Sequence, residues 1–292
     1  MNALPDSLLE LIRRTSAEIP ADVQHAILAA LEREKRGTIA QAALEIIDRN
    51  IALAKRKSQP ICQDTGSILF YVGCPVGFDQ ITFEETAREA VTLATKKGYL
   101  RQNSVDSLTG KNDGTNVGPG APTFHFHQHR SPEVSVRLVL KGGGCENVGA
   151  QYSLPDGQLQ ANRDLDGCRK AILDAVLQAQ GKGCGPGILG VCIGGDRATS
   201  YEMSKTQFLR LIPDRNPNPE LDKLEQDVLK TANELGIGPM GFGGKTTLLG
   251  VKICAANRLP ASYFVSISYM CWAYRRQGVT LDANDKIQKW LY

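Results

Sequence analysis

Apolar residues recur at helical spacing through about the first 58 residues of the chain. Leu8, Leu9, Ile12 and Ile19 mark one apolar stripe, and further stripes follow over residues 26–31 and 38–55. Spacings of three and four residues place side chains on one face of a helix. The pattern therefore predicts a helical N-terminal layer over residues 1–58, to which we assign no chemistry.

Beyond residue 66, short apolar runs alternate with amphipathic segments. Strand-like runs cover residues 67–72, 134–140, 188–193, 246–253 and 262–269, and we expect the last run to be the final strand. Helical patterns cover residues 82–99, 162–180, 199–211 and 218–235, the first opened by a capping box of Thr82 and Glu85. This order predicts an α/β fold, with α+β as the alternative, in which mixed sheets are flanked by helices. We expect one domain over residues 1–292.

Composition narrows the class of protein. The 292 residues carry 34 Lys plus Arg and 31 Asp plus Glu, a net charge of +3, too small an excess for a typical nucleic-acid binder. No apolar run approaches the ~20 residues that a membrane-spanning helix needs, and the N-terminus lacks the pattern of a secretory signal. We therefore expect a cytoplasmic protein that binds neither nucleic acid nor membrane.

The expected compartment affects how the eight cysteines are interpreted. A reducing cytoplasm favours buried thiols, catalysis or metal ligation over disulfides, and no CxxC pair occurs. Cys62, Cys145 and Cys184 each lie beside Gly or Pro in a predicted turn, and Cys271 ends an apolar strand. Ligation of an iron–sulfur cluster and simple burial both remain open for these four, and their shared setting favours the cluster.

Two further motifs each allow two interpretations. His125, His127 and His129 would share one face of a strand, so they could bind zinc, although a solvated strand face explains them better. The run Gly243-Gly244-Lys245-Thr246 is not a phosphate loop, because Pro239 stands where the signature needs glycine. It is either a site for a substrate carboxylate or a tight loop.

Polar residues near Cys62 and in the next long loop are candidates for chemistry. Asp64 follows Cys62 closely and could act as an acid or base, or it could simply form the turn. Arg101 opens a polar loop over residues 100–122. An arginine there could bind a carboxylate in bidentate fashion, or it could be an ordinary surface residue.

Taken together, the motifs resemble those of a known family. PICQDTG, LRQNSVD followed by TGKNDG, KGGGC, GCGPGILGVCIGG and MCWAYRR occur in that order between Pro60 and Arg276. This series resembles the alpha subunit, or N-terminal catalytic domain, of the class I fumarase and L(+)-tartrate dehydratase family of iron–sulfur hydro-lyases.

The resemblance implies a [4Fe–4S] cluster held by Cys62, Cys184 and Cys271, with one iron left open. It implies that Gln63, Arg101 and Gly144 bind the substrate and that Asp64 moves a proton at the substrate hydroxyl. Cys145 is not counted as a ligand, because relatives often have Ser there. The expected reaction is the reversible dehydration of a C4 2-hydroxy dicarboxylate.

The resemblance also implies a partner. Single-chain relatives carry further cationic residues and the proposed base in a C-terminal domain, so we expect a separate beta subunit and a hetero-oligomer. Fumarate and malate are the first expected substrates, and tartrate is the alternative. Relatives often have a His shortly before the last ligand, where this chain has Asn257-Arg258-Leu259-Pro260. A non-catalytic subunit of the same fold is therefore a further alternative.

Overall fold

The computed structural model describes residues 3–292, which form two compact units. The first unit comprises residues 3–21, 49–143 and 273–292, and the second comprises residues 22–48 and 144–272. Helices α1 (Leu4–Ala17), α2 (Ala21–Arg33) and α3 (Ile39–Lys57) confirm that the N-terminal segment is helical. The expected α/β class with mixed sheets and flanking helices is confirmed as well.

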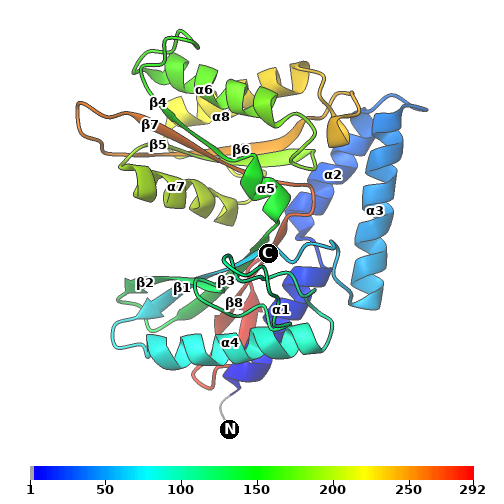
Figure 1. Cartoon of the computed structure of the whole chain (residues 1–292), viewed down its shortest axis with the longest axis vertical. Helices are drawn as coiled ribbons and strands as arrows, with labels where there is room; N and C mark the ends of the chain where they lie inside the picture. Colours follow the sequence, from blue (N-terminus) through cyan, green and yellow to red (C-terminus); the bar gives the residue numbers. More distant parts are fainter. Residues whose placement is uncertain (1–2) are drawn as a thin grey trace. The chain divides into compact units, whose positions relative to one another are not determined.

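A five-stranded mixed sheet with the order β2-β1-β3-β8-β9 forms the base of the first unit (Figure 1). The strands are β1 (Ser67–Pro75), β2 (Thr123–His129), β3 (Val134–Lys141), β8 (Arg275–Leu281) and β9 (Ile287–Trp290). Only β1 and β2 run parallel in this sheet.

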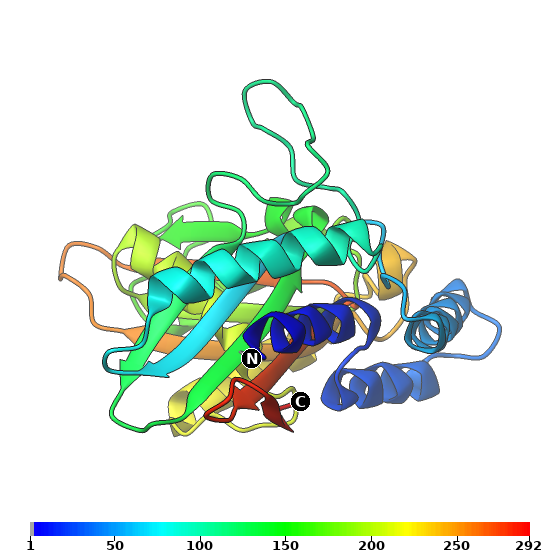
Figure 2. The same ribbon diagram turned by 90° about the horizontal axis from the view of Figure 1, so that it is seen from below.

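Helices α1 and α4 (Gln80–Lys96) cover one face of this sheet, as Figure 2 shows. The alternation along β1 sends Phe70 and Val72 into the core beneath them, where Phe70 packs edge-on against Phe83 of α4. Leu8 and Ile12 of α1 are fully buried in the same core. The loop that follows α4 extends away from the helix (Figure 2).

The second unit is built on a four-stranded sheet with the order β4-β7-β5-β6. Its strands are β4 (Ala150–Ser153), β5 (Gly187–Gly194), β6 (Leu248–Ala256) and β7 (Phe264–Met270), with β5 and β6 parallel. Helices α6 (Leu165–Ala179) and α8 (Pro219–Glu234) cover one face, and α7 (Arg197–Thr206) covers the other (Figure 1). Short helical segments complete the unit: α5 (Gly143–Asn147), η1 (Gln207–Leu209) and η2 (Pro239–Gly241).

The structure corrects two details of the sequence prediction. Helix α4 begins earlier than expected, because Asp79 is its N-cap and accepts a hydrogen bond from the Thr82 N–H (3.0 Å). The strand ending at Met270 is not the last, since β8 and β9 follow it. Within residues 3–292, no helix has the length and apolar character needed to cross a membrane.

Candidate active site

The turn between α3 and β1 carries three of the predicted site residues. It is anchored from behind at Ile61, whose N–H donates to the Ser16 carbonyl (3.1 Å) and whose own carbonyl accepts from Asn50 Nδ2 (2.9 Å). Cys62 is half-buried at this turn, and Gln63 is exposed. The anchored turn thus presents the thiol and the amide at its outer side.

Asp64 is held at both its carboxylate and its carbonyl oxygen. The Gly66 N–H donates to its Oδ1 (2.8 Å), and the Gly143 N–H donates to its Oδ2 (2.6 Å). Arg275 Nη1 donates to the Asp64 carbonyl oxygen (2.5 Å). The carboxylate therefore has one defined orientation, set by two backbone amides.

The polar loop is tied to this turn, so Arg101 lies beside it. The Thr65 hydroxyl donates to the Arg101 carbonyl (2.7 Å) and accepts from the Arg101 N–H (2.9 Å). The Thr65 N–H donates to Asn103 Oδ1 (3.1 Å). The structure thus brings Cys62, Gln63, Asp64 and Arg101 together within the first unit, with the Arg101 side chain exposed.

Asn116 is a residue that sequence reasoning left without a role. It is 2% exposed, and its Oδ1 accepts from the N–H groups of Asn103 (2.9 Å) and Ser104 (3.0 Å). Its Nδ2 donates to the Arg101 carbonyl (2.7 Å). One buried amide therefore shapes the start of the loop that carries Arg101; the only signal in the sequence was an asparagine within a long polar loop.

In the second unit, Cys184 and Cys271 are close neighbours. The N–H of Trp272, the residue after Cys271, donates to the Cys184 carbonyl (3.2 Å). Cys184 adopts a φ of 55°, in the left-handed region, which forms the tight turn before β5. Cys184 and Cys271 are 87 residues apart in the chain. The pairing of β7 with β5 therefore brings these two predicted ligands together.

Tyr269 lies near these cysteines, and its ring explains two of the glycines around Cys184. A Cβ on Gly183 would lie 2.5 Å from its ring, and one on Gly187 would lie 2.2 Å from it, so the chain passes too close for any side chain. Burial, followed by the nearby thiols of Cys271, Cys145 and Cys184, raises the pKa of Tyr269 well above its usual value. Buried Cys145 therefore belongs to the same group of thiols.

Gly144, the remaining predicted substrate contact, is an exposed residue of the short helix α5. It follows Gly143, whose N–H holds Asp64, directly along the chain. Its backbone is thus accessible, as a contact to a carboxylate requires.

Two of the three histidines of β2, His125 and His129, make other contacts in the structure. The His125 ring stacks on Tyr71, with ring centroids 4.7 Å apart, and His129 Nδ1 lies 3.1 Å from the Ser131 carbonyl oxygen. Across residues 3–292, no three or more His, Cys, Asp or Glu side chains are arranged as they stand to hold a metal ion. The zinc interpretation gains no support from this arrangement.

The loop Gly243–Thr246 is a tight structural loop rather than an anion site. The Glu34 carboxylate accepts hydrogen bonds from the N–H groups of Lys245 (2.9 and 3.0 Å) and Thr246 (2.9 Å). Glu34 is 7% exposed. The amides that could have met a substrate carboxylate are therefore already used by a carboxylate of the protein.

Residues 257–260, where the resemblance leads us to expect a His, lie far from the cysteines of the second unit. The Asn257 carbonyl accepts from the Gly195 N–H (3.2 Å), beyond the end of β5. From there the seven-residue strand β7 leads back to Cys271, a distance of about 20 Å at ~3.3 Å per residue. Asn257 is therefore at the opposite end of the sheet from Cys184 and Cys271.

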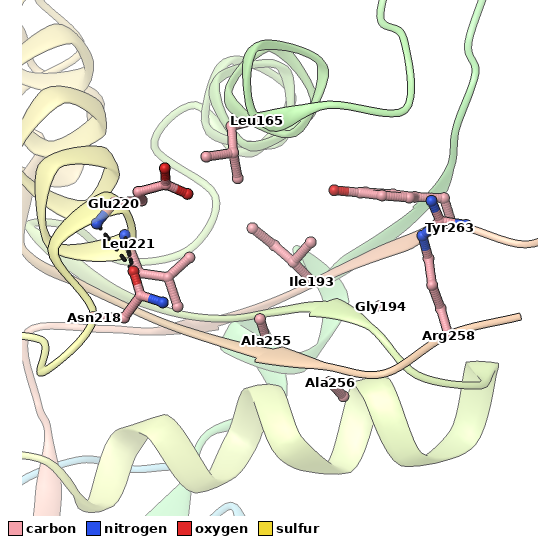
Figure 3. Close-up of a pocket in the computed structure, with 10 residues that line it drawn as sticks. All are labelled: Leu165, Ile193, Gly194, Asn218, Glu220, Leu221, Ala255, Ala256, Arg258 and Tyr263. Atoms are coloured by element: carbon pink, nitrogen blue, oxygen red, sulfur yellow. Dashed lines mark hydrogen bonds between the residues drawn. The ribbon is translucent and has the colours of Figure 1, made fainter. Parts of the chain in front are cut away.

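A cavity of about 240 Å³ is found at that opposite end (Figure 3). It lies at the carboxyl ends of the parallel strands β5 and β6, and its lining is mainly apolar, with Leu165, Ile193 and Tyr263 among the residues. Arg258 stacks over the Tyr263 ring, 4.4 Å from its centroid. None of the predicted site residues lines this cavity.

Comparisons with known proteins agree with the motifs. A family model described as "Fumarate hydratase (Fumerase)" matches residues 6–280. A Geobacillus stearothermophilus protein named "Putative fumarate hydratase class I" is 53% identical over all of this chain, which spans 58% of that relative.

Two relatives named as tartrate dehydratase subunits match along almost their whole length. "Putative L(+)-tartrate dehydratase subunit alpha" of Methanocaldococcus jannaschii is 33% identical, over 96% of this chain and 99% of the relative. "L(+)-tartrate dehydratase subunit alpha" of Escherichia coli is 28% identical, over 97% of this chain and 92% of the relative.

Proposed function

Because the chain belongs to the fumarate hydratase family, we propose that it is the alpha subunit of a hydro-lyase for C4 2-hydroxy dicarboxylates. The reaction is the reversible loss of water from malate to give fumarate. The observation that carries this proposal is the fixed Asp64 carboxylate beside Cys62 and Arg101. Dehydration of tartrate is the second candidate, favoured by the two relatives that match over nearly their full length.

The proposed cofactor is a [4Fe–4S] cluster held by Cys62, Cys184 and Cys271. Thiolates are the usual ligands of such clusters, and the adjacent Cys184 and Cys271 supply two of the three. The half-buried thiol of Cys62, at the outer side of its turn, supplies the third. When bound, the cluster would supply a Lewis acid for the departing hydroxyl group.

The protein's own residues would orient the substrate and move the proton. Arg101 is exposed and can form a bidentate pair with one carboxylate, to which the Gln63 amide can donate a further bond. The Gly144 N–H would bind the other carboxylate. Asp64, held in one orientation by Gly66 and Gly143, would accept or donate the proton at the substrate hydroxyl.

A beta subunit would complete this site. Dehydration also requires a base for the C3 proton and cations for two carboxylates, and we propose that the partner chain supplies them within a hetero-oligomer. The names of the tartrate dehydratase relatives as subunits support this arrangement. We propose a cytoplasmic location, because a reducing compartment would keep the ligand thiols available for the cluster.

The test is anaerobic purification of the chain co-expressed with a candidate beta chain. We expect about four irons and four sulfides per alpha chain, together with hydration of fumarate at a higher kcat/KM than turnover of tartrate. A preference for tartrate would establish the second candidate instead. An intact cluster with no turnover of either dicarboxylate would refute the catalytic proposal and leave a non-catalytic subunit.

A further inference from the structure

We propose that Arg275, the first residue of β8, is a positioning residue that fixes the orientation of Asp64. The inference rests on the proposed function only in assigning the proton transfer to Asp64. Neither the sequence motifs nor the comparisons gave Arg275 a role. The geometry that supports it lies entirely within the first unit.

Three donors hold the carbonyl oxygen and the carboxylate of Asp64, and its own N–H donates to Cys62 Sγ (3.5 Å). Arg275 Nη1 donates to the carbonyl oxygen (2.5 Å), while the N–H groups of Gly66 and Gly143 donate to the two carboxylate oxygens (2.8 and 2.6 Å). The two amides can hold the carboxylate only while the Asp64 peptide stays in place. Arg275 secures that peptide from β8, which is separated from β1 by β3.

The placement of Arg275 is costly for folding. The residue is 1% exposed, and its Nε and Nη2 have no hydrogen-bond partner among residues 3–292. A buried cation with unpaired donors lowers stability, and an apolar side chain of similar size in such a place is often neutral or stabilising. The hydrogen bond to Asp64 therefore explains an arginine at this position better than core packing does.

Gly142 keeps the space beside these two groups clear. A Cβ at this position would lie 3.2 Å from Asp64 Oδ2 and 3.7 Å from Arg275 Nη2. The guanidinium and the carboxylate oxygen thus border the same small region. Any larger residue would press on the carboxylate that the guanidinium helps to position.

The test compares Arg275→Met, Arg275→Lys and the control Arg13→Met in the complete complex with its cluster. Arg13 lies on α1 of the same unit and pairs with Glu10. We expect amide hydrogen exchange at Gly66 and Gly143 to become about tenfold faster or more in Arg275→Met, because the local opening that frees these amides becomes easier. Arg275→Lys should restore much of the protection, since its amine can still donate to the Asp64 carbonyl.

Kinetics and stability provide a second, independent signature. In Arg275→Met, kcat should fall by about 10- to 100-fold, with KM within about threefold of the parent, as a small misplacement of a catalytic group would cause. The melting temperature and the iron content should equal or exceed those of the parent. Arg13→Met should leave kcat and both exchange rates unchanged.

Unchanged exchange at Gly66 and Gly143 in Arg275→Met would overturn the inference, whatever the activity. A large drop in melting temperature, or a failure of Arg275→Met to fold, would also overturn it by showing a structural role. If the parent complex turned over neither fumarate nor tartrate while exchange still accelerated, the proposed function would fail and the positioning role would stand.

Discussion

At the residue scale, the exposed side chains of the candidate site are available to a ligand, whereas a buried side chain supports Asp64. Arg101 and Gln63 are exposed and available to a ligand, whereas Asp64 is held in place by backbone amides and a buried arginine. The motifs in the sequence identified Arg101, Gln63 and Asp64. They did not identify Arg275 as its support, because that contact joins residues 211 positions apart.

Arg101→Lys tests the role of the planar guanidinium. A lysine retains the charge but cannot form the two parallel hydrogen bonds of a bidentate pair. We expect KM for the dicarboxylate to rise by about tenfold or more, with kcat within about threefold of the parent. Steady-state kinetics of the complete complex measure this effect, with exposed Arg130→Lys as the control. An unchanged KM would remove Arg101 from the site.

The three proposed ligand cysteines should differ sharply from Cys168, which lies in the core of the second unit. Cys62→Ser should abolish the bound iron and sulfide, because a hydroxyl is a poor substitute for a thiolate. Cys168→Ser is the control: burial raises the pKa of the Cys168 thiol to about 11, so it stays protonated at neutral pH and is a poor ligand. Iron and sulfide analysis distinguishes the two variants. Equal loss of the cluster from both would show that the ligand assignment is wrong.

At the element scale, the apolar pattern predicted most helices and strands, and polar residues explain the errors. The strand β8 was missed because it opens with Arg275, Arg276 and Gln277, all of which are buried. Burial of such side chains depends on tertiary neighbours that no local pattern reveals. The start of α4 was misplaced because the carboxylate of Asp79 caps the helix through Thr82.

The same limit applies to the glycine-rich loops. The sequence presents Gly243–Thr246 as a candidate anion site. In the structure, however, the Glu34 carboxylate accepts hydrogen bonds from the Lys245 and Thr246 amides, and Glu34 lies between α2 and α3, 211 residues before Lys245. Around Cys184, by contrast, the glycines are required by the Tyr269 ring. Glycines in the sequence show where the backbone must pass close to another group, but the sequence does not show which group that is.

The loop after α4 should depend on Asn116. In Asn116→Ala the N–H groups of Asn103 and Ser104 lose their acceptor, at a cost of about 1–3 kcal/mol in the free energy of unfolding. We expect faster proteolysis within residues 100–122 and a higher KM, since Arg101 is carried by this loop. Exposed Asn112→Ala, which removes one hydrogen bond to the Gln102 carbonyl and one from the Gly114 N–H, is the matched control. Equal protease resistance of both variants would contradict the role of Asn116.

At the scale of the whole molecule, the chain has two units with separate hydrophobic cores. The core of the first includes Leu8, Phe70 and Leu138, and that of the second includes Ile172, Val191 and Val228. Cys62 and Cys184 are only half-buried, and Cys271, although buried, lies outside both of these core clusters. Folding of each unit should therefore not require the cluster.

Removal of the cluster tests this independence. Exposure to oxygen followed by a chelator should abolish hydration of fumarate while the far-ultraviolet circular dichroism spectrum stays unchanged, because the cores remain packed. Anaerobic reconstitution with iron, sulfide and a thiol reductant should restore the activity. A loss of helical signal on cluster removal would show that metal binding and folding are coupled, as they are in small metal-stabilised domains.

The hydrogen bonds to Asp64 also set an order of events during synthesis. They come from residues 2, 79 and 211 positions further along the chain. The ribosome synthesises these residues in order, so the nascent polypeptide contains the turn with Asp64 long before it contains β8, whose Arg275 holds that turn. Maturation of the reaction centre should consequently be a late, post-translational event, and truncated chains that stop before residue 275 should never acquire it.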